Sequence, residues 1–220
     1  PSAGMQFVTN IPWIETYGIN YYIGLDGFSL TILMMIAILI PTAYLLLWEG
    51  KTKGYWINML LVQSGVTGTL FSLDIVLFYF FWEVMLLPVF LMIGSYGFGD
   101  KVFTTIKVTV YTMAGSLLMF VAILYLGVAH FNQFGEWSFA YDSLMQISTI
   151  PYDTKVWLFL AFLAAFAIKI PIFPLHTWIM ETYKNAPTGA VFLLSSIMAK
   201  LGVYAIVRFM IPIFPDIYVE

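Results

Sequence analysis

The sequence contains no cysteine and only two histidines, His130 and His176. The absence of cysteine excludes disulfides, thiolate metal sites, cysteine nucleophiles and iron–sulfur clusters bound by this chain. Two histidines are few for a zinc or haem site built by one chain. We therefore expect neither a metal ion nor a bound cofactor in this chain.

Charged residues are scarce as well. They make up 10% of the 220 residues, against 61% hydrophobic residues, and the mean hydropathy is +0.91. Soluble domains are about 25% charged, so this composition indicates an integral membrane protein. The net charge of -3 argues against a nucleic-acid partner. Phosphate-loop, nucleophile-elbow and zinc-protease motifs are also missing, and we predict no catalytic residue.

Long apolar runs divide the chain into six predicted membrane spans, since about 20 apolar residues cross the hydrocarbon core. We expect residues 1–27 to form an extramembrane lead-in, residues 127–155 the longest connection and residues 211–220 an extramembrane tail. No basic segment follows Pro1, so we expect a fragment of a longer protein and not a preprotein with a signal peptide. The predicted spans are residues 28–48, 55–72, 74–96, 103–126, 156–183 and 188–210.

The fifth predicted span is interrupted. Residues 165–178 (AFAIKIPIFPLHTW) place Lys169 near the end of an apolar run, just before Pro171 and Pro174. Proline lacks the backbone donor and clashes with the carbonyl one turn earlier, so the helix must break at residues 171–174. A broken helix with an ionisable side chain is typical of membrane ion carriers. The predicted fold is an all-α transmembrane bundle with one discontinuous helix.

Three ionisable residues lie deep within predicted spans. Glu83 is roughly 13 Å into the third span and Lys200 roughly 18 Å into the last, at 1.5 Å per residue. Each would cost about 2.5–3.5 kcal/mol if it faced lipid. We therefore expect Glu83, Lys169 and Lys200 to face a protein interior, with the carboxylate beside an ammonium group.

Two interpretations of these residues stay open. A buried carboxylate and lysine can simply fix the helix register as a structural ion pair. One carboxylate cannot neutralise two ammonium groups, however, which favours proton transfer through Lys169 or Lys200. His176 follows the proline break and could relay protons through water, although a histidine that only caps free carbonyls would have the same sequence. Lys107 lies about one turn inside its span and is expected to snorkel to the interface.

The basic residues predict the orientation. When successive loops alternate between the two sides, Lys155 and Arg208 fall on one side and four lysines fall on the other. The positive-inside rule puts the four-lysine side in the cytoplasm or its organellar equivalent, with the amino end and residues 127–155 outside. These four are Lys51, Lys53, Lys101 and Lys184.

Several motifs occur in the order found in one known family. Residues 80–88 (FFWEVMLLP), the proline break with its following histidine and tryptophan, residues 186–188 (APT) and residues 200–204 (KLGVY) resemble the antiporter-like membrane subunits of respiratory complex I. Residues 25–30 (LDGFSL) resemble the start of a span in the same family. Within that family the motifs look most like those of the subunit 4 type, which is called subunit M in bacteria.

This resemblance implies a fold and a set of roles. The protein would contain the first of two inverted repeats, with Glu83 as the family's essential glutamate and Lys169 as its paired lysine. His176 and Lys200 would continue a proton path along the central axis. The helix break at Pro171 and Pro174 would be structural.

The resemblance also implies a setting. The subunit would translocate protons in a NADH:quinone oxidoreductase of a respiratory chain, beside other membrane subunits and lipid, in a bacterial inner, mitochondrial inner or thylakoid membrane. NAD, FMN, iron–sulfur clusters and quinone would be bound elsewhere in the complex, which as a whole would carry the enzyme activity. The alternatives are a subunit of a multi-subunit cation/proton antiporter or membrane-bound hydrogenase, and a purely structural membrane module.

Overall fold

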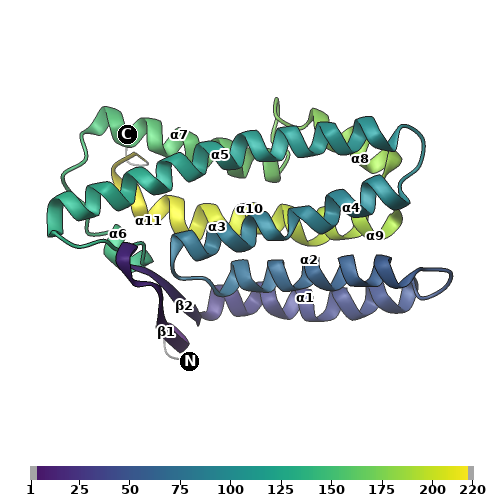
Figure 1. Ribbon diagram of the computed structural model, residues 1–220, viewed down its shortest axis with the longest axis horizontal. Helices are drawn as coiled ribbons and strands as arrows, with labels where there is room; N and C mark the ends of the chain where they lie inside the picture. The colour runs from purple at the N-terminus through teal and green to yellow at the C-terminus, as the bar shows by residue number, and fades with distance from the viewer. Residues whose placement is uncertain (1–3, 218–220) are drawn as a thin grey trace.

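The computed structural model describes residues 4–217, so what the sequence predicts for residues 1–3 and 218–220 lies outside the described part. Its helices lie side by side along the longest axis of the molecule (Figure 1). The main helices are α1 (Gly27–Leu46), α2 (Lys53–Phe71), α3 (Ile75–Val84), α4 (Leu86–Tyr96), α5 (Lys101–Phe134), α7 (Tyr152–Lys169), α8 (Thr177–Asn185), α9 (Thr188–Leu193) and α10 (Ala199–Ala205). The short helices are α6 (Tyr141–Leu144) and α11 (Ile211–Ile213).

The last span is one helical rod of mixed type. Two π-helical turns, η2 (Leu194–Met198) and η3 (Ile206–Met210), separate α9, α10 and α11. A π turn widens the helix locally and changes the direction in which the following side chains point. The rod ends in the 3₁₀ turn η4 (Pro215–Ile217), so the described part of the predicted tail is helical.

The lead-in forms a β-hairpin, which the sequence analysis did not predict. Strand β1 (Gln6–Ile14) pairs antiparallel with β2 (Ile19–Leu25), and the 3₁₀ turn η1 (Glu15–Tyr17) connects them. The hairpin lies at the end of the bundle that also holds α6 and α11 (Figure 1). Leu73 N donates to Tyr22 O at 2.8 Å, so the hairpin is tied to the α2–α3 turn.

Short polar side chains cap the N-termini of four helices. Asp26, Thr52, Asp74 and Asp100 each accept a backbone N–H from the first turn of α1, α2, α3 and α5. Such caps satisfy amides that have no partner within the helix. Asp74 is fully buried and also accepts Asn20 N at 3.1 Å. Burial raises the pKa of Asp74, and the three backbone amides only partly offset that effect.

The prediction that the long connection begins at Gly127 is wrong. Helix α5 continues to Phe134 and ends at Gly135, which has a φ of 80°. A left-handed glycine of this kind is a common helix terminus. Gly127 instead lies inside the helix, where its missing side chain leaves room for the Phe139 ring. The connection therefore runs from Gly135 to the start of α7.

The third and fifth predicted spans are both divided, to different extents. Residues 74–96 form α3 and α4 with an irregular turn at Met85, three residues before Pro88, which supplies no backbone donor. In the fifth span α7 stops at Lys169 and α8 starts at Thr177, so the helix breaks where the prolines predict.

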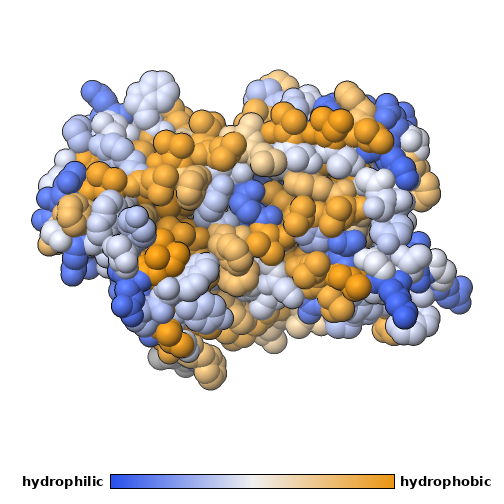
Figure 2. All heavy atoms as spheres, in the orientation of Figure 1, coloured by the Kyte–Doolittle hydropathy of each residue, from blue (hydrophilic) through white to orange (hydrophobic). Residues whose placement is uncertain are grey.

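The bundle has the dimensions and surface of a membrane domain. Four helical segments are long and apolar enough to cross a membrane, namely Gly27–Leu46, Ile75–Tyr96, Lys101–Phe134 and Thr188–Ile213. Figure 2 shows apolar residues over most of the middle of one face and polar residues gathered at the two ends of the long axis. We propose α2 and the interrupted α7–α8 segment as the fifth and sixth spans.

Small residues set the spacing of the helices. A Cβ atom on Gly65 of α2 would lie 2.6 Å from Met85 Cβ and 2.9 Å from Met85 Cα, at the irregular turn after α3. On Gly115 of α5 a Cβ would lie 2.7 Å from Ile168 Cδ1 in α7. Helix α2 is therefore in close contact with the turn that follows Glu83, and α5 is in close contact with the end of α7 that carries Lys169.

We expect Gly65→Ala to destabilise the protein by about 1–3 kcal/mol, because the new methyl group collides with backbone atoms of Met85. The measurement is the thermal unfolding temperature of the purified protein in detergent. Gly27→Ala is the control, since no atom of residues 4–217 outside its chain neighbours and its own helix backbone would lie within 4 Å of a Cβ there. An unchanged unfolding temperature for Gly65→Ala would contradict the close packing.

Candidate functional site

Glu83 lies near the end of α3, inside the bundle. Its Oε1 atom is buried and has no hydrogen-bond partner in the described structure. Ser116 of α5 lies beside the carboxylate, as does Tyr79 one turn earlier in α3. The carboxylate therefore lies between α3 and α5 with the hydroxyl groups of Ser116 and Tyr79 as polar neighbours.

Lys169 is the last residue of α7 and is 4% exposed. Its Nζ atom has no hydrogen-bond partner among residues 4–217. It lies 4.6 Å from the centroid of the Trp82 ring. A protonated amine there is attracted by the face of the indole.

The predicted direct contact between Glu83 and Lys169 is not formed. Within the described residues, ion pairs at or below 4.0 Å occur only between Lys155 and Asp216 and between Arg208 and Asp26. The two side chains are still near enough for their charges to interact. The structure thus holds the two groups as neighbours in an open arrangement.

The backbone at the helix break is repaired by two hydrogen bonds. Trp178 donates its indole N–H to Ile168 O at 3.0 Å, and Ile172 N donates to Ala167 O at 2.9 Å. Carbonyl groups next to a proline break would otherwise lack donors in an apolar medium. These bonds keep Lys169 at a stable helix end.

His176 lies in the break, immediately before α8. Its ring is 5.6 Å from the Phe173 ring, and its Nδ1 atom is buried without a hydrogen-bond partner in the described part of the chain. No side-chain bond from His176 caps the start of α8. The capping alternative therefore finds no support at Nδ1.

Lys200 does not face the interior of the described part of this chain. Lys200 is exposed, and its Nζ donates to Ser195 O at 2.7 Å. This carbonyl belongs to the π turn η2, which aims the side chain outward. Gly202, two residues on, packs against Ile170. Helix α10 thus lies beside the end of α7, while Lys200 points away from that contact.

Lys107 lies partly exposed in α5 with its Nζ 5.9 Å from the Phe103 ring. Phe103 is one turn nearer the start of the helix, so the side chain extends toward the end of the bundle. This direction is the one that snorkelling requires.

Sequence reasoning missed a buried cluster around Arg208. Its Nη2 atom lies 2.6 Å from Asp26 Oδ1 and donates to Ser29 Oγ at 3.0 Å. Its Nε donates to Tyr204 Oη at 3.2 Å, and Tyr204 donates to Leu70 O at 2.9 Å. The cluster joins the lead-in, α1, α2 and the last span. The sequence signal for this ion pair was a carboxylate, Asp26, beside the start of one predicted span and an arginine, Arg208, near the end of another.

The charges in this cluster stabilise each other. Burial alone raises the pKa of Asp26, but hydrogen bonds from Arg208 and from the Ser29 amide, with the positive charge of Arg208, hold it below the ordinary value of 3.8. Arg208 does not release its proton at accessible pH. The cluster is therefore a permanent ion pair and no proton carrier.

The basic residues lie at the two ends of the bundle in the way that the predicted alternation of loops requires. Thr52 and Tyr96 share a hydrogen bond of 2.9 Å, and Phe98 N donates to Asn185 O at 2.6 Å, so three loops meet at one end. The four lysines assigned to one side lie on or next to these loops. Lys155 and Arg208 lie at the other end, with the hairpin.

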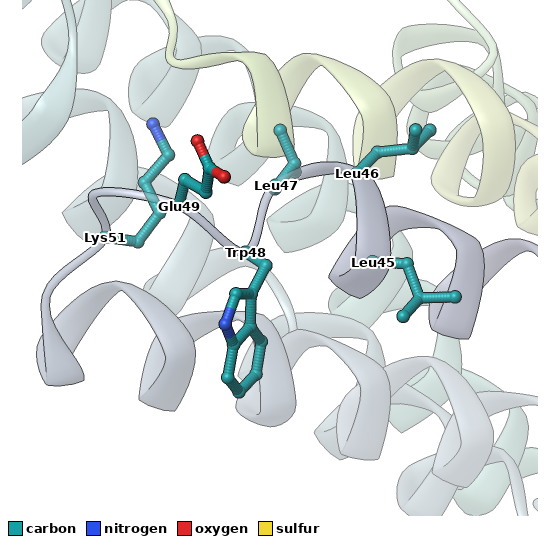
Figure 3. A pocket seen from close by; sticks show the side chains of 6 residues that line it. All are labelled: Leu45, Leu46, Leu47, Trp48, Glu49 and Lys51. Carbon is teal, nitrogen blue, oxygen red and sulfur yellow. The ribbon is translucent and has the colours of Figure 1, made fainter.

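Within residues 4–217, no group of three or more histidine, aspartate or glutamate side chains could hold a metal ion. A surface hollow of about 710 Å³ at the α1–α2 turn is drawn in Figure 3. It shares no residue with the Glu83 and Lys169 region. Its lining residues are Leu45, Leu46, Leu47, Trp48, Glu49 and Lys51.

The fold and site define a polytopic membrane protein with a discontinuous helix and a buried carboxylate and lysine beside the break. Residues 72–219 match the family described as NADH:quinone oxidoreductase/Mrp antiporter, TM. The chain is 34% identical over 230 residues to NADH-quinone oxidoreductase subunit M of Escherichia coli (strain K12). That alignment covers 100% of this chain and 45% of the relative, so the chain spans less than half of the relative's length.

Solved structures show the same fold. A chain of respiratory complex I from Thermus thermophilus superposes with a TM-score of 0.87 at 29% identity, over 99% of this chain and 45% of that chain. A chain of the Mrp complex from Dietzia sp. gives a TM-score of 0.76 at 20% identity, over 96% of this chain and 24% of that chain. The chain belongs to the NADH:quinone oxidoreductase/Mrp antiporter family of membrane proteins.

We expect Asp26→Asn to destabilise the protein by about 1.5–3 kcal/mol, because it removes the carboxylate that bonds a buried guanidinium. Asp216→Asn, at the more exposed Lys155 pair, should cost less than about 1 kcal/mol. The measurement is the thermal unfolding temperature in detergent.

The same comparison has a defined pH dependence. A depressed carboxyl pKa contributes stability above its unfolded value, about 3.9, and loses it as the pH falls through the folded value. The difference between native protein and Asp26→Asn should therefore persist from neutral pH to about pH 4 and shrink below it. A difference that grows on acidification would contradict the ion pair.

Proposed function

We propose that this chain is the proton-carrying membrane part of an antiporter-like subunit of a NADH:quinone oxidoreductase. The observation that supports it is the pair of buried ionisable atoms, Glu83 Oε1 and Lys169 Nζ, which lack hydrogen-bond partners in the described structure. Unpaired charges in an apolar interior cost stability. Their arrangement serves reversible proton binding better than it serves packing.

The proposed cycle has two states. In the closed state Lys169 pairs with Glu83 and holds its proton. In the open state, which the present geometry resembles, the ammonium has left the carboxylate, and loss of that neighbouring charge favours release of the proton. The proton then moves through water toward His176, whose buried Nδ1 is free to accept it.

Lys200 would receive the proton at the surface of this chain. An ammonium group exposed at mid-span on an apolar helix is costly against lipid, so a protein neighbour is expected to cover it. The relatives' greater length supports such a neighbour. In this proposal Lys200 passes the proton to a second helical repeat that packs on α10.

The remaining parts of the proposal concern the complex. Redox chemistry with NAD, FMN, iron–sulfur clusters and quinone would take place in other subunits, and this chain would bind lipid and neighbouring membrane subunits. The membrane would be a bacterial inner, mitochondrial inner or thylakoid membrane. The end with the β-hairpin and the α5–α7 connection would face outward, because the four lysines lie at the opposite end.

A second candidate is a subunit of a multi-subunit cation/proton antiporter or a related membrane-bound hydrogenase. The description of the matching family and the likeness to the Mrp complex favour it. The buried carboxylate and lysine suit either function, so ion dependence separates them. Transport that requires sodium would favour the antiporter, and transport coupled to quinone reduction would favour the oxidoreductase.

A structural membrane module is the third candidate. In that case the carboxylate and lysine only fix the packing of α3 against α7. A Glu83→Gln, Lys169→Met double variant would then assemble and support normal transport. The unpaired state of both groups argues against this candidate, since a register-fixing pair should be in contact.

We expect Glu83→Gln to lower proton pumping at least about tenfold, because an amide keeps the shape but cannot cycle its charge. Pumping would be measured in membrane vesicles that contain the assembled complex, with quinone reduction recorded in parallel. Glu49→Gln, at an exposed loop position, is the matched control. Full pumping by the Glu83 variant would rule out the proposed cycle.

We expect Lys169→Arg to abolish most pumping as well, because a guanidinium group does not release its proton at accessible pH. The assay is the same vesicle measurement, and Lys107→Arg in α5 is the control. Assembly should be normal in both variants, since the positive charge is kept. If the arginine variant pumps at the native rate, Lys169 is only a fixed charge.

A further inference from the structure

The side chain that touches the Lys169 ammonium is an aromatic ring. Trp82 precedes Glu83 in α3, and its ring centroid is 4.6 Å from Lys169 Nζ. Trp82 is 1% exposed and Lys169 is 4% exposed, so both side chains lie inside the apolar core and are shielded from solvent. No carboxylate lies within 4.0 Å of Lys169 in residues 4–217.

The indole is held firmly from both helices. Its ring is 5.4 Å from Phe78, one turn earlier in α3, and 5.5 Å from Phe166, one turn before Lys169 in α7. Phe78 is itself 4.5 Å from Phe209 in the last span. Rings packed in this way cannot follow a moving side chain, whereas the four-carbon stem of a lysine can swing. The ring is therefore the fixed partner and the ammonium the mobile one.

An aromatic face distinguishes the two protonation states of a lysine. Its negative quadrupole attracts an ammonium ion, most strongly for tryptophan and where water is excluded. A neutral amine carries no full charge and gains little from the same position. Consecutive helical residues point about 100° apart, so α3 presents the ring of Trp82 and the carboxylate of Glu83 as two adjacent positions for one side chain.

We infer that Trp82 is a positioning residue that receives the protonated Lys169 side chain when it leaves Glu83. In the open state the ring stabilises the ammonium form and so opposes the proton release that loss of the Glu83 charge favours; the balance sets the pH range in which Lys169 keeps or releases its proton. This inference rests on the proposed function of Lys169 as a proton carrier and adds the group that controls it.

The test replaces Trp82 by tryptophans with one, two and three ring fluorines, introduced at this position alone. Fluorine withdraws density from the ring face and weakens its attraction for a cation, with little change in size. Proton pumping by the complex in vesicles would be recorded against pH. A weaker ring holds the proton on Lys169 less firmly, so the alkaline limit of pumping should move to lower pH as fluorines are added, by about half a unit or more over the series.

Trp137 provides the matched control. It is partly buried, stacks on Phe131 with the ring centroids 4.9 Å apart, and has no cation over its ring in the described structure. The same fluorine series there should leave the pH profile unchanged. Trp82→Leu, which removes the ring, should give the largest shift or loss of pumping with quinone reduction still measurable.

An unmoved pH profile across the Trp82 series would overturn the inference and leave Trp82 as a packing residue. That result leaves the proposed function intact, provided that Glu83→Gln and Lys169→Arg fail to pump. If those two variants pump normally, the proton-carrier role itself is wrong. The two failures are therefore distinguishable.

Discussion

A membrane offers no hydrogen bonds to a broken helix, and this constraint governs the centre of the molecule. The prolines at 171 and 174 end α7 at Lys169. The freed backbone would be unstable if nothing else supplied donors. The indole N–H of Trp178 and the amide of Ile172 supply two of them. Because the break is stabilised in this way, a lysine can sit at a helix end inside the apolar core.

The two buried cationic side chains, Arg208 and Lys169, are held in different ways. Arg208 forms an ion pair with Asp26 and hydrogen bonds with Ser29 and Tyr204, and this set of bonds fixes four segments of the chain relative to each other. Among residues 4–217, the Lys169 ammonium has the ring of Trp82 near it and no hydrogen-bond partner, and it does not touch the Glu83 carboxylate. A guanidinium suits the permanent anchor, whereas an amine suits a site where the charge must come and go.

The outer surface of the last span carries a third lysine or arginine side chain, Lys200, which is exposed. The π turn η2 aims Lys200 out of the bundle and onto Ser195 O. An exposed lysine at that depth has a clear physical meaning, since about 2.5–3.5 kcal/mol would be lost against lipid. The face that carries it is therefore suited to contact with further protein, in keeping with the greater length of the relatives.

Much of the architecture is local and was readable from the sequence. The membrane class follows from composition, the helix break follows from two prolines, and the four lysines at one end follow from their loop positions. These properties belong to short stretches of sequence, so they need no knowledge of neighbours. The positions of Glu83 and Lys169 in the interior follow from the cost of charge in lipid.

The partners of each charge were decided only by the tertiary structure. Asp26 and Arg208 are far apart in sequence, and the residues around each do not predict that the two will pair. The placement of Lys169 over Trp82 and not against Glu83 depends on the rotation of α3 about its axis, where one residue changes the direction by about 100°. The outward direction of Lys200 follows a π turn, and the position of the β-hairpin is tied to the α2–α3 turn by the bond from Leu73 N to Tyr22 O. Side-chain contacts between helices are set by such rotations and packings, and no single stretch of sequence contains them.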